Sequence, residues 1–167
     1  HIVSGVIHSQ FGYNNVGFHL TQRQMTIDLS GELSMEQLRQ VEQMANQKVW
    51  DNLPVEIFWP SPQELETLPY RSKKELFEAV RLVRIPETDL CACCGTHVAC
   101  TGEIGLIKLI SCQRFREGVR IELACGKRAL DFCNLVLEQN HGVSVLLSAK
   151  VGETSQAVER LYQEKER

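Results

Sequence analysis

Residues 93–126, CCGTHVACTGEIGLIKLISCQRFREGVRIELACG, join a glycine-containing turn to two long runs of strand-forming residues. The runs, 104–114 and 119–125, flank a short polar turn and predict an antiparallel pair of strands. In the turn that precedes them, Cys93 lies four residues before His97. Thiolate sulfur and imidazole nitrogen are ligands that suit zinc, but a zinc site needs at least one more protein ligand from elsewhere in the chain.

The rest of the sequence predicts helices and strands that are segregated rather than alternating. Apolar residues at helical spacing, with capping and stop signals, predict helices at 1–12, 34–49, 63–68, 127–139 and 153–167. Runs rich in β-formers predict further strands at 16–20, 25–29, 55–59 and 80–85. We therefore expect an α+β fold in which helices pack on an antiparallel sheet, with the metal-binding turn in the connection 86–102.

Size and composition are those of an ordinary globular chain. The 167 residues allow one domain with a small appendage, and the net charge of −3 gives no overall attraction to nucleic acid. No run approaches the roughly 18 apolar residues that a membrane helix needs, and no signal peptide is recognisable, so we expect a cytoplasmic protein without membrane contact. Because the sequence opens on His1 rather than methionine, we expect further residues before it.

The seven cysteines favour thiol or metal chemistry over a disulfide framework, because their number is odd and four of them cluster. Within that cluster, Cys91 and Cys100 offer an alternative, thiol-rich site together with Cys93 and Cys94. The other three are expected to be small buried hydrophobic residues: Cys112, Cys125 and Cys133.

Two runs carry a resemblance to a known family. HIVSGVIHSQFGYNNVGFHLTQRQMTIDLSG (1–31) and the run at 93–126 resemble the editing domain shared by alanyl-tRNA synthetases and the free-standing alanyl-tRNA editing proteins of the AlaX type. In that family an HxxxH motif opens a helix, and a motif usually written CGGTH precedes TGEIGL and a strand pair. The resemblance implies the editing-domain fold for residues 1–140, with 141–167 as a helical tail.

The resemblance also implies a ligand set for zinc. His1 matches the second histidine of HxxxH, and Cys93 and His97 match the cysteine and histidine of CGGTH. The partner expected four residues away on the helix is not at Gly5, so it is expected upstream of His1. Cys94 departs from the family pattern, which usually has glycine there.

The implied function is hydrolysis of the ester that joins serine, or possibly glycine, to the tRNA for alanine. Three interpretations remain open: a free-standing editing hydrolase, the editing part of a full alanyl-tRNA synthetase, and a non-catalytic tRNA-binding module stabilised by zinc. The oligomeric state is left open by the sequence.

Further residues are candidates for the amino-acid pocket and for tRNA binding. His19 and Thr96 are candidates for the pocket, although a structural histidine and a plain turn residue explain them equally well. Basic residues around the predicted strand pair are the candidates for contacts with tRNA phosphates: Arg114, Arg116, Arg120, Lys127 and Arg128.

Overall fold

The computed structural model describes residues 1–22, 24–72 and 79–166. The chain forms two compact units, His1–Gly126 and Lys127–Arg167. The expected division at residue 140 falls inside helix α4 (Lys127–Leu146), which belongs to the second unit. The α+β class is confirmed, because the first unit combines helices with two antiparallel sheets.

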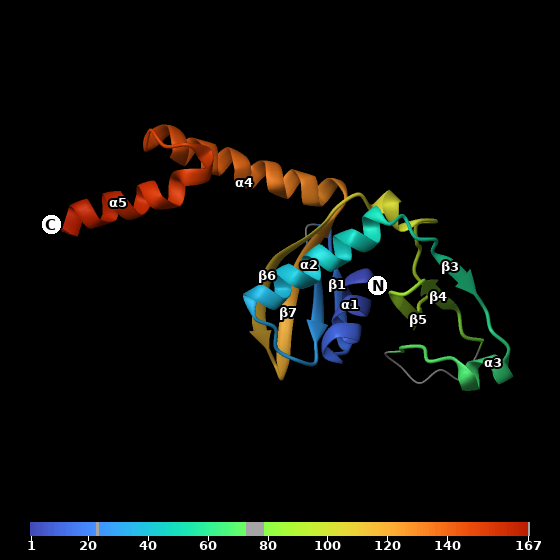
Figure 1. Ribbon diagram of the computed structural model, residues 1–167. Coiled ribbons are helices and arrows are strands. Elements are labelled where there is room, and N and C mark those ends of the chain that lie inside the picture. The colour runs from blue at the N-terminus through green and yellow to red at the C-terminus, as the bar shows by residue number, and fades with distance from the viewer. Residues whose placement is uncertain (23, 73–78, 167) are drawn as a thin grey trace. The chain divides into compact units, whose positions relative to one another are not determined.

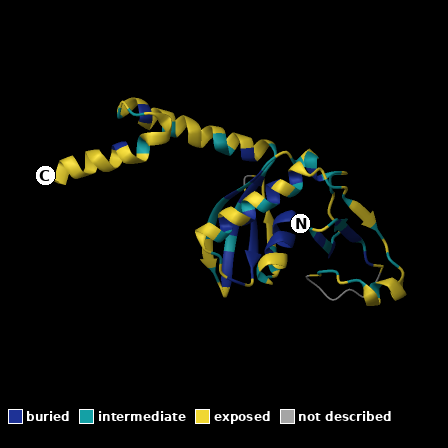
Figure 2. Cartoon of the chain, in the orientation of Figure 1, coloured by how far each residue is buried: buried dark blue, intermediate teal, exposed yellow. Residues whose placement is uncertain are grey.

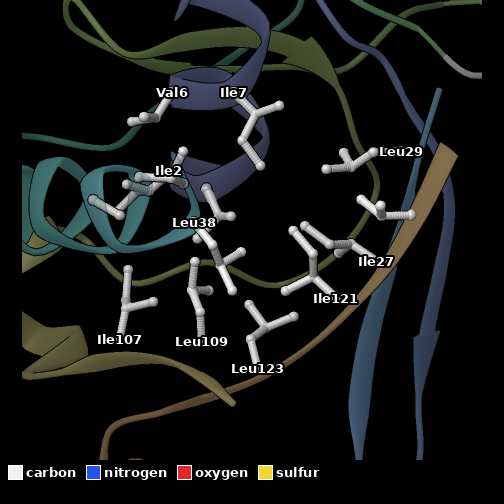
Figure 3. Close-up of a cluster of buried hydrophobic side chains, with 14 of the residues drawn as sticks. Ile2, Val6, Ile7, Ile27, Leu29, Leu38, Ile107, Leu109, Ile121 and Leu123 are labelled. Atoms are coloured by element: carbon white, nitrogen blue, oxygen red, sulfur yellow. The ribbon is translucent and has the colours of Figure 1, made fainter. Parts of the chain in front are cut away.

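The larger sheet of the first unit has four strands in the order β1-β2-β7-β6 (Figure 1). Its strands are β1 (Asn15–Leu20), β2 (Met25–Leu29), β6 (Ile107–Phe115) and β7 (Gly118–Cys125). Two helices, α1 (Ile2–Phe11) and α2 (Met35–Trp50), form one hydrophobic core with it. Figure 3 shows side chains of both helices converging on those of the strands, with Ile7 and Ile121 fully buried.

Helix α2 matches the sequence prediction closely. Ser34 accepts a hydrogen bond from the backbone N–H of Gln37, whose side chain in turn accepts one from the N–H of Ser34. This capping box satisfies two of the donors that a helix N-terminus leaves free. Of the residues at helical spacing, Met35 is exposed, but four further along the helix are buried: Leu38, Val41, Ala45 and Val49. Both the start of α2 and its buried face therefore follow from local sequence.

A smaller sheet, β3-β4-β5, leads into the turn that contains Cys93 and His97. Its strands are β3 (Glu56–Phe58), β4 (Leu82–Ile85) and β5 (Asp89–Ala92), and the short helix α3 (Pro62–Thr67) follows β3. Strand β5 corrects the prediction that 86–102 is entirely a loop. It escapes detection because it has only four residues, and because its inward positions are an aspartate and a cysteine rather than β-branched residues.

The first predicted strand of the long pair also starts later than expected. Residues Thr101–Ile104 form a 3₁₀ turn, and Gly105 adopts a left-handed φ of 77° before β6 begins at Ile107. Glycine adopts such a φ without steric cost. The TGEIG segment is therefore a turn that redirects the chain into the sheet.

Strand β1 contains a bulge at Val16. Asn15 pairs with Leu29 and Phe18 pairs with Ile27, so the two residues point to the same face although they are three apart. In a regular strand, residues at odd spacing point to opposite faces. The extra residue thus brings both Asn15 and Phe18 to the side of the sheet on which α1 packs.

The second unit consists of α4, a 3₁₀ turn at Val151–Glu153 and helix α5 (Thr154–Glu166). Helix α4 continues to Leu146, beyond the predicted end at 139. Asn140 ties the pair together, since its side chain donates to the carbonyl of Val151 and accepts from the hydroxyl of Thr154. Figure 2 shows that most residues of α4 and α5 are exposed. Among the described residues, no helix combines the length and the hydropathy that crossing a bilayer requires.

Thr101 is a buried polar anchor for the turn that leads into β6. Its side chain is fully buried, its hydroxyl donates to the carbonyl of Lys48, and it accepts a hydrogen bond from the backbone N–H of Leu53. A buried donor or acceptor that loses its partner costs about 1–3 kcal/mol. Thr101 therefore joins the end of α2 to the beginning of the TGEIG turn.

Thr101→Val should lower the free energy of unfolding by about 2–4 kcal/mol, because valine has nearly the same shape but leaves both backbone groups without a partner. Urea unfolding followed by circular dichroism measures the change. Thr67→Val is the matched control: Thr67 is exposed and bonds only within its own short helix, so its effect should stay within about 0.5 kcal/mol. Equal effects of the two changes would contradict the assignment.

Candidate functional site

The candidate site lies where the start of α1 meets the end of β5. His1 is the N-cap residue of α1, and Cys93 and His97 lie in the turn after β5. One ligand atom from each of the three lies within 4.8 Å of the others, and the rings of His1 and His97 have centroids 4.9 Å apart. Tertiary folding therefore brings together three residues that the sequence singles out as metal ligands.

Asp89 fixes the orientation of the His1 ring. Its Oδ2 lies 3.2 Å from His1 Nδ1, and its Oδ1 accepts two hydrogen bonds from Arg71, at 2.9 and 2.6 Å. The carboxylate is almost fully buried. With Nδ1 engaged by Asp89, the free nitrogen for a metal is Nε2, an arrangement in which a carboxylate holds a histidine ligand in place.

The charges around the cluster favour an ionised cysteine. Burial lowers the pKa of His1, but hydrogen bonds to Asp89, Cys91 and Cys93 outweigh this and raise it to about 10. Burial raises the pKa of Cys93, yet the Gly95 N–H, His1 and Arg81 outweigh it, so the pKa lies below its ordinary value. The two shifts favour a protonated His1 beside an ionised Cys93.

The donor set and its surroundings fit a zinc ion. Burial lowers the pKa of His97, and the nearby positive charges of His1 and Arg81 lower it further, so this ring stays neutral as a ligand requires. Among the described residues, the Nδ1 of His97 is the one buried side-chain nitrogen or oxygen that lacks a hydrogen-bond partner. One sulfur and two imidazole ligands are a combination that binds zinc in proteins.

Position 5 is closed to a further side chain. A Cβ added at Gly5 would lie 2.3 Å from the carbonyl oxygen of Thr88, so no ligand side chain fits one turn along α1 from His1.

A second group of possible metal ligands among the described residues consists of His1, Asp89 and Cys91, with Cys91 Sγ 2.9 Å from His1 Nδ1. The alternative site built from four cysteines is therefore supported only for Cys91 and Cys93. Cys94 and Cys100 belong to neither of the two groups of possible metal ligands found among the described residues.

A cavity of about 430 Å³ opens beside the cluster. His1, Cys91 and Cys93 form part of its wall, and Phe18 contributes an aromatic surface. Its polar lining includes Ser4 and Asn15, which are joined by a 2.8 Å hydrogen bond from Asn15 Nδ2 to Ser4 Oγ. The Ser4 hydroxyl accepts this bond, so its own proton remains available to donate.

The two residues proposed for the amino-acid pocket lie elsewhere. His19 follows Phe18 in β1 and projects from the opposite face of the sheet, where its Nε2 lies 3.3 Å from Asp28 Oδ2. Thr96 is exposed in the turn, and neither residue is among the described residues that line the cavity. Asn15 and Ser4 occupy that position instead.

The basic candidates for tRNA contact are mostly paired with acids. Arg120 donates to both carboxylate oxygens of Asp28, Arg114 lies 3.5 Å from Glu32, and Lys127 pairs with Asp131. Arg116, at a left-handed φ of 54°, lies over the ring of Phe115. Arg114, Arg116 and Arg120 belong to the first unit, and Lys127 and Arg128 to the second; their contact with tRNA stays a prediction.

Sequence reasoning missed Asp89 and Arg71, although one signal for Asp89 was present. Asp89, Cys91 and Cys93 alternate along the chain, which is the spacing of side chains on one face of a strand. Arg71 has no such signal, because only the tertiary fold brings it to Asp89.

Asp89→Asn should lower the free energy of unfolding at pH 7 by about 3–5 kcal/mol, because it leaves Arg71 and protonated His1 without their buried anion. Burial would raise the pKa of Asp89, but His1 and Arg71 hold it below its ordinary value of 3.8. A lowered pKa means that the carboxylate stabilises the fold above about pH 4, and that this contribution is lost as the pH falls through the lowered value.

The difference between parent and Asp89→Asn should accordingly shrink on acidification, which urea unfolding at stepwise lower pH measures. Asp51→Asn, at an exposed residue at the end of α2, is the control and should change stability little. A difference that stays constant through the acid range would contradict the role of the Asp89 charge.

Comparison with known proteins finds relatives of this chain. Residues 80–122 match the family described as threonyl and alanyl tRNA synthetase second additional domain. The chain is 29% identical over 153 residues to the alanyl-tRNA editing protein AlaX-L of Pyrococcus horikoshii, a match covering 90% of this chain and 38% of that protein.

Alanine–tRNA ligases are also similar. Identity is 34% over 137 residues with the ligase of Natronomonas pharaonis, covering 79% of this chain and 15% of the ligase. It is 33% over 160 residues with that of Shouchella clausii, covering 90% of this chain and 18% of the ligase. The chain thus spans less than half the length of each of these relatives. The resemblance of the chain to alanyl-tRNA editing proteins of the AlaX type and to the matching part of alanine–tRNA ligases is confirmed.

Proposed function

We propose that this chain hydrolyses the ester that joins serine, and also glycine, to the tRNA for alanine. The observation that carries the proposal is the cluster of His1, Cys93 and His97 on the wall of a cavity large enough for an amino acid and part of a nucleotide. The similarity to a protein named for alanyl-tRNA editing supports the same substrate class. The similarity to ligases is equally extensive, and the proposed chemistry is the same for a free-standing protein and for a part of a synthetase.

The need for such a site follows from the limits of binding. A pocket built for alanine cannot exclude the smaller glycine, and a hydrophobic pocket rejects an added hydroxyl only weakly. A second site that hydrolyses the wrong products solves the problem if it prefers what the first site admits in error.

His1, Cys93 and His97 are the residues that would hold zinc. The metal would supply a Lewis acid that polarises the ester carbonyl or lowers the pKa of a bound water. Asp89 holds the His1 ring in the ligating orientation, and Arg71 holds Asp89. Arg81 donates to the carbonyl oxygen of Cys93 and so steadies the turn that presents the thiolate.

Ser4 and Asn15 are the groups we assign to recognition of serine. Both line the cavity, and Ser4 is buried. A serine hydroxyl accepts the proton of the Ser4 hydroxyl, whereas the methyl group of alanine leaves it without a partner. A buried polar group that only the right substrate satisfies is an effective means of discrimination.

Cys93→Ala should lose bound zinc and deacylation of serine-charged tRNA together, because it removes the single sulfur ligand of the cluster. Metal content by atomic emission and release of labelled serine measure the two losses. Cys133→Ala, at a cysteine in α4 of the second unit, is the matched control and should retain both. Full deacylation by a variant verified to be metal-free would contradict the zinc-dependent mechanism.

Ser4→Ala should reduce kcat/KM for serine-charged tRNA about 10-fold, because one hydrogen bond worth about 1.4 kcal/mol is lost. Glycine-charged tRNA supplies the internal control: glycine has no hydroxyl, so its deacylation should be nearly unchanged. A parallel loss for both substrates would show that Ser4 acts on structure rather than on recognition.

A further inference from the structure

The three strands of the smaller sheet place one row of side chains on the cavity side. Strand β3 pairs with β4 through Ile57–Val83 and Phe58–Leu82, and continuing this register by one residue sets Trp59 opposite Arg81. On the other side of Arg81, the N–H of Cys93 donates to the carbonyl of Arg81. Trp59 directly follows β3, Arg81 directly precedes β4 and Cys93 directly follows β5, so the three residues are neighbours at this end of the sheet.

The alternation of side chains along the strands shows which face of the sheet these residues are on. Val83 pairs with Cys91, and Cys91 contacts His1, so this face of the sheet is the one toward the cluster. Residues two apart share a face in a strand, which puts Arg81 and Cys93 on the same side as Val83 and Cys91. Arg81 and Cys93 both line the cavity. Phe58 and Arg84 lie on the opposite face.

Trp59 is unusually exposed for a residue of its kind. It is 62% exposed, and Ile57, two residues earlier on the same face, is 38% exposed. The guanidinium of Arg81 lies 5.9 Å from the centre of the Trp59 ring and donates to the carbonyl of Cys93. Arg81, which lines the cavity, thus has an exposed indole beside it, and we call these two residues the rim.

This combination suits an unpaired nucleotide. Bases of single-stranded nucleic acid stack on exposed aromatic rings, and a neighbouring arginine attracts the phosphate backbone. The guanidinium of Arg81 carries the positive charge beside the ring, opposite to the charge of a phosphate chain.

We propose that Trp59, with Arg81, receives a base of the unpaired 3′ end of a charged RNA, adjacent to the nucleotide that bears the ester. This inference rests on the proposed function for the identity of the RNA. The rim then aligns the 3′ end so that the aminoacyl group enters the cavity beside His1 and Cys93.

Tryptophan fluorescence tests the proposal directly. The chain has two tryptophans, and Trp50, at the end of α2, is exposed to the same degree as Trp59. In Trp50→Phe, Trp59 is the remaining fluorophore, and a short single-stranded oligoribonucleotide ending in CCA should quench it. In Trp59→Phe, where Trp50 remains, the same oligonucleotide should leave the fluorescence unchanged.

Binding and turnover provide a second readout. Trp59→Ala should weaken binding of the oligonucleotide about 10-fold, as expected for loss of one stacked base, and should raise KM for charged tRNA more than it lowers kcat. Arg84→Gln is the matched control, since Arg84 also lies over an aromatic ring, that of Phe58, but on the opposite face. It should leave both values nearly unchanged.

The two proposals fail in different ways. Absence of quenching in Trp50→Phe, or equal binding by parent and Trp59→Ala, would overturn the rim as a nucleotide site and leave a protein partner as its occupant. Quenching and weakened binding without any deacylation by the parent would instead support the rim and reject the proposed hydrolysis.

Discussion

The close approach of α1 to the turn between β4 and β5 is the constraint on which the rest of the site depends. At Gly5 the helix lies so near the carbonyl of Thr88 that any side chain would collide with it. Only glycine permits this contact. Because the helix lies this near, His1 at its start reaches Asp89 and Cys91 of β5, and the helix forms the link between the two sheets. The site is thus a consequence of backbone packing, to which the ligand residues are added.

The sequence correctly predicted the helices and strands that several independent local signals indicate. Helix α2 has a capping box, helical periodicity and a charged outer face, and all three agree. Strands β6 and β7 are rich in branched residues and form the expected antiparallel pair. Strand β5 has none of these signals. It exists because its backbone pairs with β4 and because its aspartate finds Arg71 and His1, which are partners distant in sequence.

The residues of the candidate site also differ in whether local sequence predicts them. The spacing of Cys93 and His97 indicated metal chemistry by itself, and the resemblance to a family added His1. Asp89, which orients the His1 ring, could not be predicted from the sequence because its role depends on Arg71 and His1, which are 18 and 88 positions away. His19 was a candidate for the pocket because it lies on the strand after the first helix. Adjacent residues of a strand face opposite ways, so Phe18 lies on the cavity side and His19 does not.

The bulge at Val16 places two residues of β1 on the cavity side of the sheet, Asn15 and Phe18. It turns Asn15 to the side of Phe18 without disturbing the pairs from Gly17 to Leu20. Deleting this one residue would restore regular pairing, with Asn15 still opposite Leu29 and two residues before Phe18 on the same face. The bulge therefore takes up one residue of chain length while Asn15 and Phe18 both keep the face toward the cavity.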